Sequence, residues 1–196
     1  METSVPRKIP PSGIFCYICS MTELESELLK EYPFIQCRKV DDTPVKDCTY
    51  LGGIPKGWVK AFGRQMCEDF ASAAKEDGVK LDYLRVIDAK EKFGTLRWYW
   101  GRTGKSRRLE RVTMMYEEVA GAFCAKCGAH PVMMTTGYVL PLCEDCWKLW
   151  REKSISDDSR PFKPEFPEIT VTRTVDGKEV SEKLPLKELY EDILRR

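Results

Sequence analysis

The strongest constraint on this chain is a set of four cysteines in its second half. They form two Cys-x-x-Cys pairs, Cys124/Cys127 and Cys143/Cys146, with 15 residues between the pairs. Structural zinc takes four tetrahedral ligands with Zn–S distances of about 2.3 Å, and a Cys-x-x-Cys turn makes two thiolates converge on one ion. The cysteines therefore predict a zinc site, whose binding free energy of roughly 10–16 kcal/mol would be part of folding.

The residues around the two pairs predict the shape of this site. Residues 128–142, GAHPVMMTTGYVLPL, can fold back as a hairpin that brings Cys127 near Cys143. The following CEDCWKLWREKS predicts a helix that carries the second pair in its first turn. The turn that carries the first Cys-x-x-Cys pair, the hairpin and the ligand-bearing helix together indicate a treble-clef zinc finger over residues 124–150. A redox dithiol, which needs only one such pair, and iron in the same four-thiolate shell are the alternatives.

The composition indicates that the cysteines bind metal rather than form disulfides. The chain has nine cysteines, an odd number, among 196 residues, with 42% hydrophobic residues and a net charge of +1. No run approaches the roughly 18 apolar residues that cross a bilayer, and the apolar stretch at 14–19 is short for a signal peptide. We therefore expect a cytoplasmic protein with no membrane partner. Thiols stay reduced in that compartment, where clustered cysteines more often bind metal.

Four further cysteines lie within the first 50 residues of the chain. Cys16 and Cys19 form a third Cys-x-x-Cys pair, and Cys37 and Cys48 follow in a segment without a second pair. Either these four hold a second zinc ion or they are free thiols. Cys67, beside Met66 in a helical pattern, is expected to be a packed thiol. The single histidine, His130, is expected to lie beside the first site rather than to bind its metal.

The hydrophobic pattern predicts an α+β fold. Helices are expected at 20–32, with a Ser20/Glu23 capping box, at 55–78, at 107–123 and at 185–196. Residues 35–57 read as a loop. Two strands are expected near 84–86 and 96–100, with residues 89–94 as their connection, and a hairpin is expected around Asp176-Gly177. The predicted organisation is an N-terminal segment (1–19), a core domain (20–151) that contains the zinc finger, a linker (152–168) and a C-terminal hairpin-helix (169–196).

A basic stretch covers residues 90–111. It carries eight cations against two glutamates and is interleaved with four aromatic residues. Cations for phosphates beside aromatic faces for bases are typical of single-stranded nucleic-acid binding. The alternative is that Trp98 and Trp100, which share a strand face, belong to the core and that the cations form an ordinary solvent-exposed surface. The candidate nucleic-acid ligands are Lys90, Lys92, Arg97, Arg102, Lys105, Arg107, Arg108 and Arg111.

Four strings in chain order resemble a known family. EYPF, the GW that opens the longest helix, KEKFGTLRWY and CAKCG…LCEDC are similar to small uncharacterised proteins encoded mainly by bacteriophages and prophages, in which a VKEKFGTLRFY-like string precedes a four-cysteine element. The resemblance covers residues 24–147. It implies a phage or mobile-element origin, a location in the bacterial cytoplasm, and zinc, but no activity. The Cys16/Cys19 pair and the tail from residue 152 depart from the pattern.

These observations favour a non-enzymatic binding protein. A Ser/His/Asp set would have to use His130, and no pair of acidic residues has a diagnostic spacing. A four-cysteine shell also leaves zinc no open position at which to activate water. The expected partner is a host or phage protein, as for a host-directed inhibitor or accessory factor, and nucleic-acid binding through residues 90–111 is the alternative. The sequence does not indicate an oligomeric state.

Overall fold

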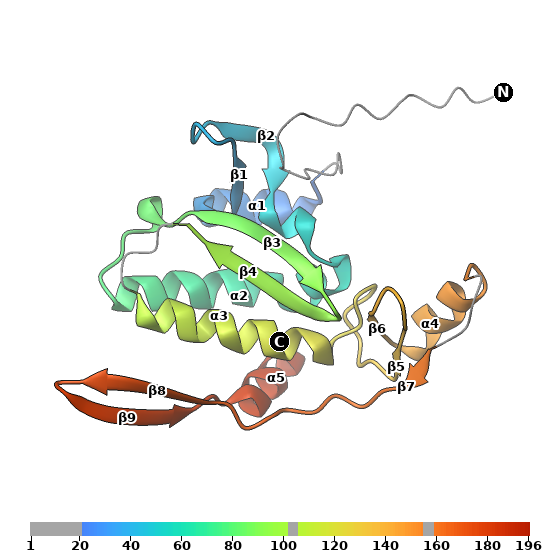
Figure 1. Cartoon of the computed structure of the whole chain (residues 1–196). Helices are drawn as coiled ribbons and strands as arrows, with labels where there is room; N and C mark the ends of the chain where they lie inside the picture. The colour runs from blue at the N-terminus through green and yellow to red at the C-terminus, as the bar shows by residue number, and fades with distance from the viewer. Residues whose placement is uncertain (1–20, 102–105, 155–158) are drawn as a thin grey trace.

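The computed structural model describes residues 21–101, 106–154 and 159–196, which form an α+β fold (Figure 1). Helices and short antiparallel strands alternate along the chain. The helices are α1 (Glu23–Glu31), α2 (Lys56–Glu76), α3 (Arg107–Val119), α4 (Glu144–Arg151) and α5 (Leu186–Arg195), with single 3-10 turns η1 (Pro33–Ile35), η2 (Tyr50–Gly53), η3 (Leu81–Tyr83) and η4 (Ala120–Ala122). The strands are β1 (Gln36–Arg38), β2 (Pro44–Thr49), β3 (Val86–Lys92), β4 (Thr95–Trp100), β5 (Met133–Met134), β6 (Pro141–Leu142), β7 (Arg160–Pro161), β8 (Thr170–Val175) and β9 (Lys178–Lys183).

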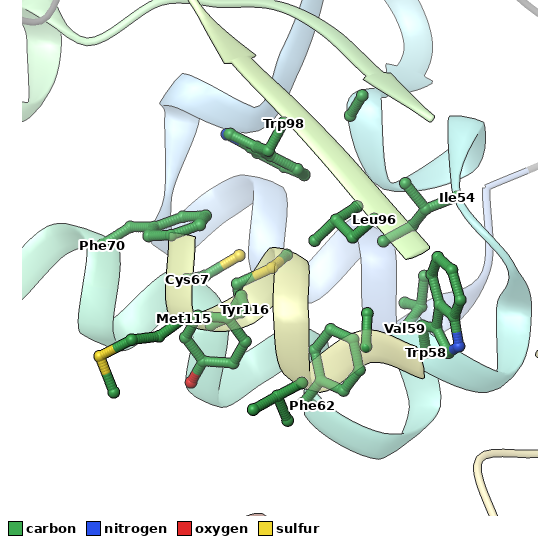
Figure 2. Packing of buried hydrophobic residues seen from close by; sticks show 14 of the residues in the cluster. Ile54, Trp58, Val59, Phe62, Cys67, Phe70, Leu96, Trp98, Met115 and Tyr116 are labelled. Carbon is green, nitrogen blue, oxygen red and sulfur yellow. The ribbon is translucent and has the colours of Figure 1, made fainter. Parts of the chain in front are cut away.

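The main core lies between the β3–β4 hairpin and the helices α2 and α3 (Figure 1). The apolar residues that recur at every fourth position of α2, which form the apolar stripe of this helix, are all buried: Trp58, Phe62, Met66 and Phe70. Figure 2 shows Leu96 and Trp98 pointing from β4 toward these helices. Phe70 is at the centre, with its ring 5.5 Å from that of Trp98 and 5.8 Å from that of Tyr116. Aromatic packing of this kind fixes the distance between the helices and the hairpin.

The β3–β4 hairpin is longer than the sequence predicted. Its register pairs Ala89 with Trp98 and Lys92 with Thr95, so residues 89–92 of the expected connection (89–94) belong to β3. The turn is only Phe93-Gly94, and both residues have positive φ, 55° and 80°. Two-residue turns with positive φ match the right-handed twist of the paired strands, which explains why the strands continue to this point.

The N-terminal region differs from the prediction in two places. The capping box of α1 uses Thr22 and Glu25, so the Ser20/Glu23 assignment was wrong by two residues. The segment expected to be a loop contains the antiparallel β1–β2 pair, with a register shift and Asp47 at φ 52°. A bulged hairpin of this kind breaks the alternation of apolar and polar residues, which is why the pattern concealed it.

The C-terminal residues fold back onto the core. β8 and β9 pair across a turn at Asp176-Gly177, and α5 buries Leu186, Leu189 and Ile193. In Figure 1, α5 lies on the side of α2 and α3 opposite the β3–β4 hairpin. β7, from the predicted linker, pairs with β5. None of the described helices is long and apolar enough to cross a membrane.

Candidate metal centre

The first Cys-x-x-Cys pair lies in a tight turn directly after α3 and η4. The Cys124 N–H donates to the carbonyl of Ala129 (2.7 Å), and the Gly128 N–H donates to the carbonyl of Cys124 (2.9 Å). Gly128 has φ 86°, a conformation that a residue with a Cβ adopts only with strain. This turn directs the Cys124 and Cys127 sulfurs to the same side.

The start of α2 holds this turn in place. The Gly57 N–H donates to the carbonyl of Ala125 (3.1 Å), and the Trp58 indole N–H donates to the carbonyl of Phe123 (3.0 Å). A Cβ added to Gly57 would lie 2.2 Å from the Cys124 carbonyl oxygen, so only glycine permits this approach. The cysteine turn is therefore bonded directly to the longest helix of the core.

A short hairpin brings the second pair to the first. Met133 pairs with Leu142 across β5 and β6, which places Cys143 beside Cys127 with their sulfurs 3.5 Å apart. Cys143 is the N-cap of α4, and Cys146 lies in the first turn of that helix. The sulfurs of all four predicted cysteines lie within 4.8 Å of one another. The expectation of an α+β fold with a four-cysteine cluster is thus confirmed.

This cluster fits a zinc ion. A tetrahedral shell with Zn–S distances of about 2.3 Å requires sulfurs about 3.8 Å apart, within the spread of this cluster. Cys124 is buried and the other three are half-buried, so protein surrounds most of the shell. When bound, zinc would supply a structural cross-link between the α3–β5 turn and α4. Four thiolates of one polypeptide are a donor set that soft metals such as zinc prefer.

The protein environment affects the four thiols unequally. Burial acts to raise the pKa of Cys124, but backbone N–H groups of Cys143, Cys127 and Lys126 donate toward its sulfur and lower the pKa overall. Burial raises the pKa of Cys127 and of Cys146. Metal binding requires thiolates, so the latter two must release protons when an ion enters.

His130 lies outside this cluster. Its ring is exposed, and its Nδ1 is 3.0 Å from the hydroxyl of Tyr190 on α5. Among the described residues, the side chains close enough together to share one metal ion are the four cysteines, and His130 is not one of them. The imidazole is therefore placed to form a hydrogen bond with Tyr190 of α5.

The other predicted cysteine site is described only in part. Cys37 and Cys48 lie on the neighbouring strands β1 and β2, and both are buried. Cys16 and Cys19 lie outside the described residues. Cys67 is a fully buried thiol in α2, as predicted, and burial raises its pKa.

The basic stretch does not form one surface. Lys90, Lys92 and Arg97 lie on the outer face of the β3–β4 hairpin, opposite the core, and Arg107 is exposed on α3. Arg108 forms ion pairs with Glu76 (3.0 Å) and Asp77 (2.6 Å), and Arg111 forms one with Glu182 (2.9 Å). Trp98 and Trp100 face the core. The two remaining candidates, Arg102 and Lys105, lie outside the described residues.

A groove that the sequence did not indicate lies where the β1–β2 hairpin meets the start of β3. Its volume is about 570 Å³. Asp42 lies at its edge, with ion-pair distances of 3.5 Å to Arg38 and 3.4 Å to Arg85. The groove was missed because it depends on the unpredicted β1–β2 pair. Its walls comprise Arg38, Lys39, Val40, Asp42, Tyr50, Tyr83, Arg85, Val86, Ile87 and Gly101.

Comparison with known proteins adds no family to this description. No family model matches the sequence, and searches of curated proteins and of solved structures return no significant match.

Proposed function

We propose that this chain is a zinc-stabilised, non-enzymatic binding protein that acts by contact with another protein. The four-cysteine cluster supports a structural zinc ion, and the order of turn, β5–β6 pair and α4 supports a treble-clef zinc finger. We further propose a phage or mobile-element origin and action in the bacterial cytoplasm on a host or phage protein, as an inhibitor or accessory factor. The sequence resemblance is the support for this part of the proposal.

The groove beside β1 and β3 is the observation that carries the binding proposal. Val40, Tyr83 and Ile87 line it and are 95%, 68% and 61% exposed, although all three side chains are apolar or aromatic. Exposed apolar groups gathered at one place are typical of interaction sites. Tyrosine and arginine, which also line the groove, are enriched among residues that dominate binding energy. Its three cations exceed its one carboxylate, so the surface favours a partner with acidic residues.

The positions of the titratable groups support a non-catalytic role. Burial raises the pKa of Asp69, whose carboxylate accepts a 2.6 Å hydrogen bond from Tyr116 inside the helix layer. Burial likewise raises the pKa of Glu117, which accepts the N–H of Trp98. Neither carboxylate is among the groove-lining residues. Their partners are structural groups of the core, and this favours a role in packing.

A capture experiment with matched variants tests the proposal. Full-length protein would be immobilised and exposed to bacterial extract, and any retained protein would be identified, purified and titrated calorimetrically. We expect a Tyr83→Ala/Ile87→Ser variant to bind that partner at least tenfold more weakly. Leu194→Ser, an equally exposed apolar site on α5, should change affinity less than twofold. Equal binding by both variants would remove the groove from the proposal, and no retained partner for the wild-type chain would remove protein binding.

Nucleic-acid binding is a second candidate because of the outer face of β3–β4. Phe93 is 73% exposed at the turn, and Tyr99 is exposed further along β4, where it pairs with Asp88 of β3. The Lys90 ammonium lies 5.3 Å from the Tyr99 ring centroid, and that of Lys92 lies 5.5 Å from the Phe93 centroid. Exposed rings beside cations are the arrangement on which unpaired bases stack.

Fluorescence anisotropy with labelled single-stranded DNA and RNA distinguishes this candidate. If it holds, Phe93→Ala/Tyr99→Ala should weaken binding by more than tenfold, since each stacked base is worth about 1–3 kcal/mol. Arg108→Gln, whose charge is already paired with Glu76 and Asp77, should have a much smaller effect. Absence of binding at low salt would eliminate the candidate.

A further inference from the structure

The groove beside β1 and β3 already contains a carboxylate of the chain itself. Asp42 lies in the turn between β1 and β2, and its two carboxylate oxygens are 3.5 Å from Nη1 of Arg38 and 3.4 Å from Nε of Arg85. Arg38 ends β1, whereas Arg85 directly precedes β3. The Asp42 side chain therefore bridges two elements, far apart in the chain, that line the same groove.

The two contacts of this carboxylate are loose. Hydrogen bonds between a guanidinium and a carboxylate are typically about 2.7–2.9 Å long, and both distances here exceed that range. The Asp42 side chain is also 63% exposed, and exposed ion pairs are weak because water and salt screen the two charges. The Asp42 carboxylate is therefore a counter-ion that another carboxylate can replace.

Backbone carbonyl groups orient the two arginines without help from the Asp42 carboxylate. Nη1 of Arg38 donates to the Asp42 carbonyl (2.9 Å), and Nη1 of Arg85 donates to the carbonyls of Asp82 (2.6 Å) and Leu84 (2.8 Å). The Nη2 groups of both arginines donate to no acceptor among the residues that the structure describes. Arginine binds a carboxylate best through two N–H groups at once, so both guanidiniums retain donors for an incoming carboxylate.

Exposed apolar side chains of the same groove lie beside these cations. They are Val40, Tyr83 and Ile87. The β3–β4 register shifts between Val86 and Asp88, which makes Ile87 the extra residue of a bulge, and bulges redirect side chains next to functional sites. A small inorganic anion would reach the arginines but leave these apolar groups in water. A peptide with an acidic residue between apolar ones would cover both.

We infer that Asp42 occupies the position of a carboxylate of the partner protein and competes with it for Arg38 and Arg85. The partner presents an extended segment in which an acidic residue is flanked by apolar residues. Its carboxylate displaces that of Asp42, and its apolar side chains cover Tyr83 and Ile87. This inference rests on the proposed protein-binding function of the groove, and it adds the class of segment that the groove recognises and an internal contact that weakens binding.

Fluorescence anisotropy with a synthetic peptide tests the competition. The probe is a short labelled peptide in which glutamates alternate with leucines and tyrosines, titrated with the full-length chain. Asp42→Asn preserves the shape of the side chain but removes the competing charge, so this variant should bind the peptide at least fivefold more tightly than the wild-type chain. A gain of affinity cannot result from misfolding.

Asp41→Asn is the matched control. It removes the same charge one residue away, from a carboxylate that accepts the N–H of Thr43 and does not line the groove, and it should change affinity less than twofold. Equal affinities of the two asparagine variants would overturn the inference, because the gain would then come from net charge alone. Absence of binding to the Asp42→Asn variant at about 1 mM would also overturn it.

Two further comparisons test the cations and the partner. Arg38→Gln/Arg85→Gln should bind the peptide at least tenfold more weakly than the wild-type chain, and so should a peptide with glutamine in place of glutamate bound to the wild-type chain. Equal binding of the two peptides would overturn the inference. A partner retained from bacterial extract separates this inference from the binding proposal. If Tyr83→Ala/Ile87→Ser weakened its binding but Asp42→Asn did not change it, the groove would remain the binding site and the competition would be refuted.

Discussion

The helix-and-hairpin core and the cysteine region are stabilised in different ways. In the core, α2 alone buries Trp58, Phe62, Met66 and Phe70. Figure 2 shows Phe62 and Phe70 on the same side of α2 as Tyr116 of α3 and Trp98 of β4, whose rings they contact. In the cysteine region, β5 and β6 are two residues long each, and no residue of α4, which is described in full, is fully buried. The cysteine region does bury Phe123, Leu140 and Leu142, but its strands are short, and four converging sulfurs can supply it with a cross-link through a metal ion.

The two regions nevertheless meet at a rigid junction. Gly57 of α2 packs against the backbone of Cys124 without space for a methyl group. We therefore expect a substitution within one region to affect mainly that region, and a substitution at Gly57 to affect both.

The largest effect is expected from Cys143→Ser, which removes one ligand from the shell. Because zinc binding to such sites is worth roughly 10–16 kcal/mol, the region from Phe123 to Arg151 should unfold locally while α2 and α3 stay folded. Amide hydrogen exchange should show lost protection in the cysteine region and retained protection in α2, and elemental analysis should show one zinc fewer. Unchanged protection in the cysteine region would contradict its dependence on metal. Cys67→Ser is the control that keeps the metal.

The converse change is Phe70→Ala in the core. Removing a fully buried aromatic ring costs about 3–5 kcal/mol, because the cavity it leaves cannot fully close. Thermal or urea unfolding should record this loss, while the zinc content of the folded protein stays the same. Phe93→Ala, at an exposed ring, should change stability by less than about 0.5 kcal/mol. Loss of zinc from the Phe70 variant would mean that the two regions do not fold independently of each other.

These two regions also differ in what the sequence alone could predict. The α2 stripe and the Cys-x-x-Cys pairs are local patterns, because the helical period and the ligand spacing are set within a few residues. The β1–β2 pair, the groove and the contact between Gly57 and Cys124 depend on segments far apart in the chain. The basic stretch shows the same limit. Its charges are close together in sequence, but the acids that pair with them are not. Arg108 pairs with Glu76 of α2 and with Asp77, which follows that helix, and Arg111 pairs with Glu182 of β9.

Gly57→Ala tests the junction itself. The added methyl group would lie 2.2 Å from the Cys124 oxygen and 2.7 Å from the nitrogens of Cys127 and Gly128, so either α2 or the cysteine turn must move. We expect a loss of about 3 kcal/mol in unfolding free energy and weaker zinc affinity in a chelator competition. Gly52→Ala, where the nearest atom is 3.4 Å away, is the matched control and should be close to neutral. A Gly57 variant with unchanged stability and zinc affinity would show that the junction adapts.

A smaller, pH-dependent effect is expected at the start of α3. Partial burial acts to raise the pKa of Asp77, but hydrogen bonds from the Arg108 N–H, the Arg108 guanidinium and the Ser106 hydroxyl lower it overall. A depressed pKa in the folded state contributes stability above the unfolded pKa of about 3.9, and that contribution is lost as the pH falls through the folded value.

Asp77→Asn should therefore destabilise the protein at pH 7 by about 1 kcal/mol, the net value of a typical hydrogen bond. The difference from the wild-type protein should shrink as the pH falls below about 4, measured by urea unfolding at a series of pH values. A difference that is constant with pH would mean that the carboxylate charge does not contribute. Asp82→Asn, at an exposed position in η3, is the control and should change the free energy of unfolding at pH 7 by less than about 0.5 kcal/mol.

The smallest effect is expected from His130→Ala, and it bears directly on the metal shell. The exposed His130 ring bonds Tyr190, and the four sulfurs already complete a tetrahedral set, so zinc content should not change and stability should fall by less than about 0.5 kcal/mol. Tyr190→Phe removes the same hydrogen bond from the other partner and should match it. If His130→Ala alone lost zinc, an imidazole would have to replace one thiolate. That result would leave one cysteine free of metal and would contradict the proposed four-thiolate shell.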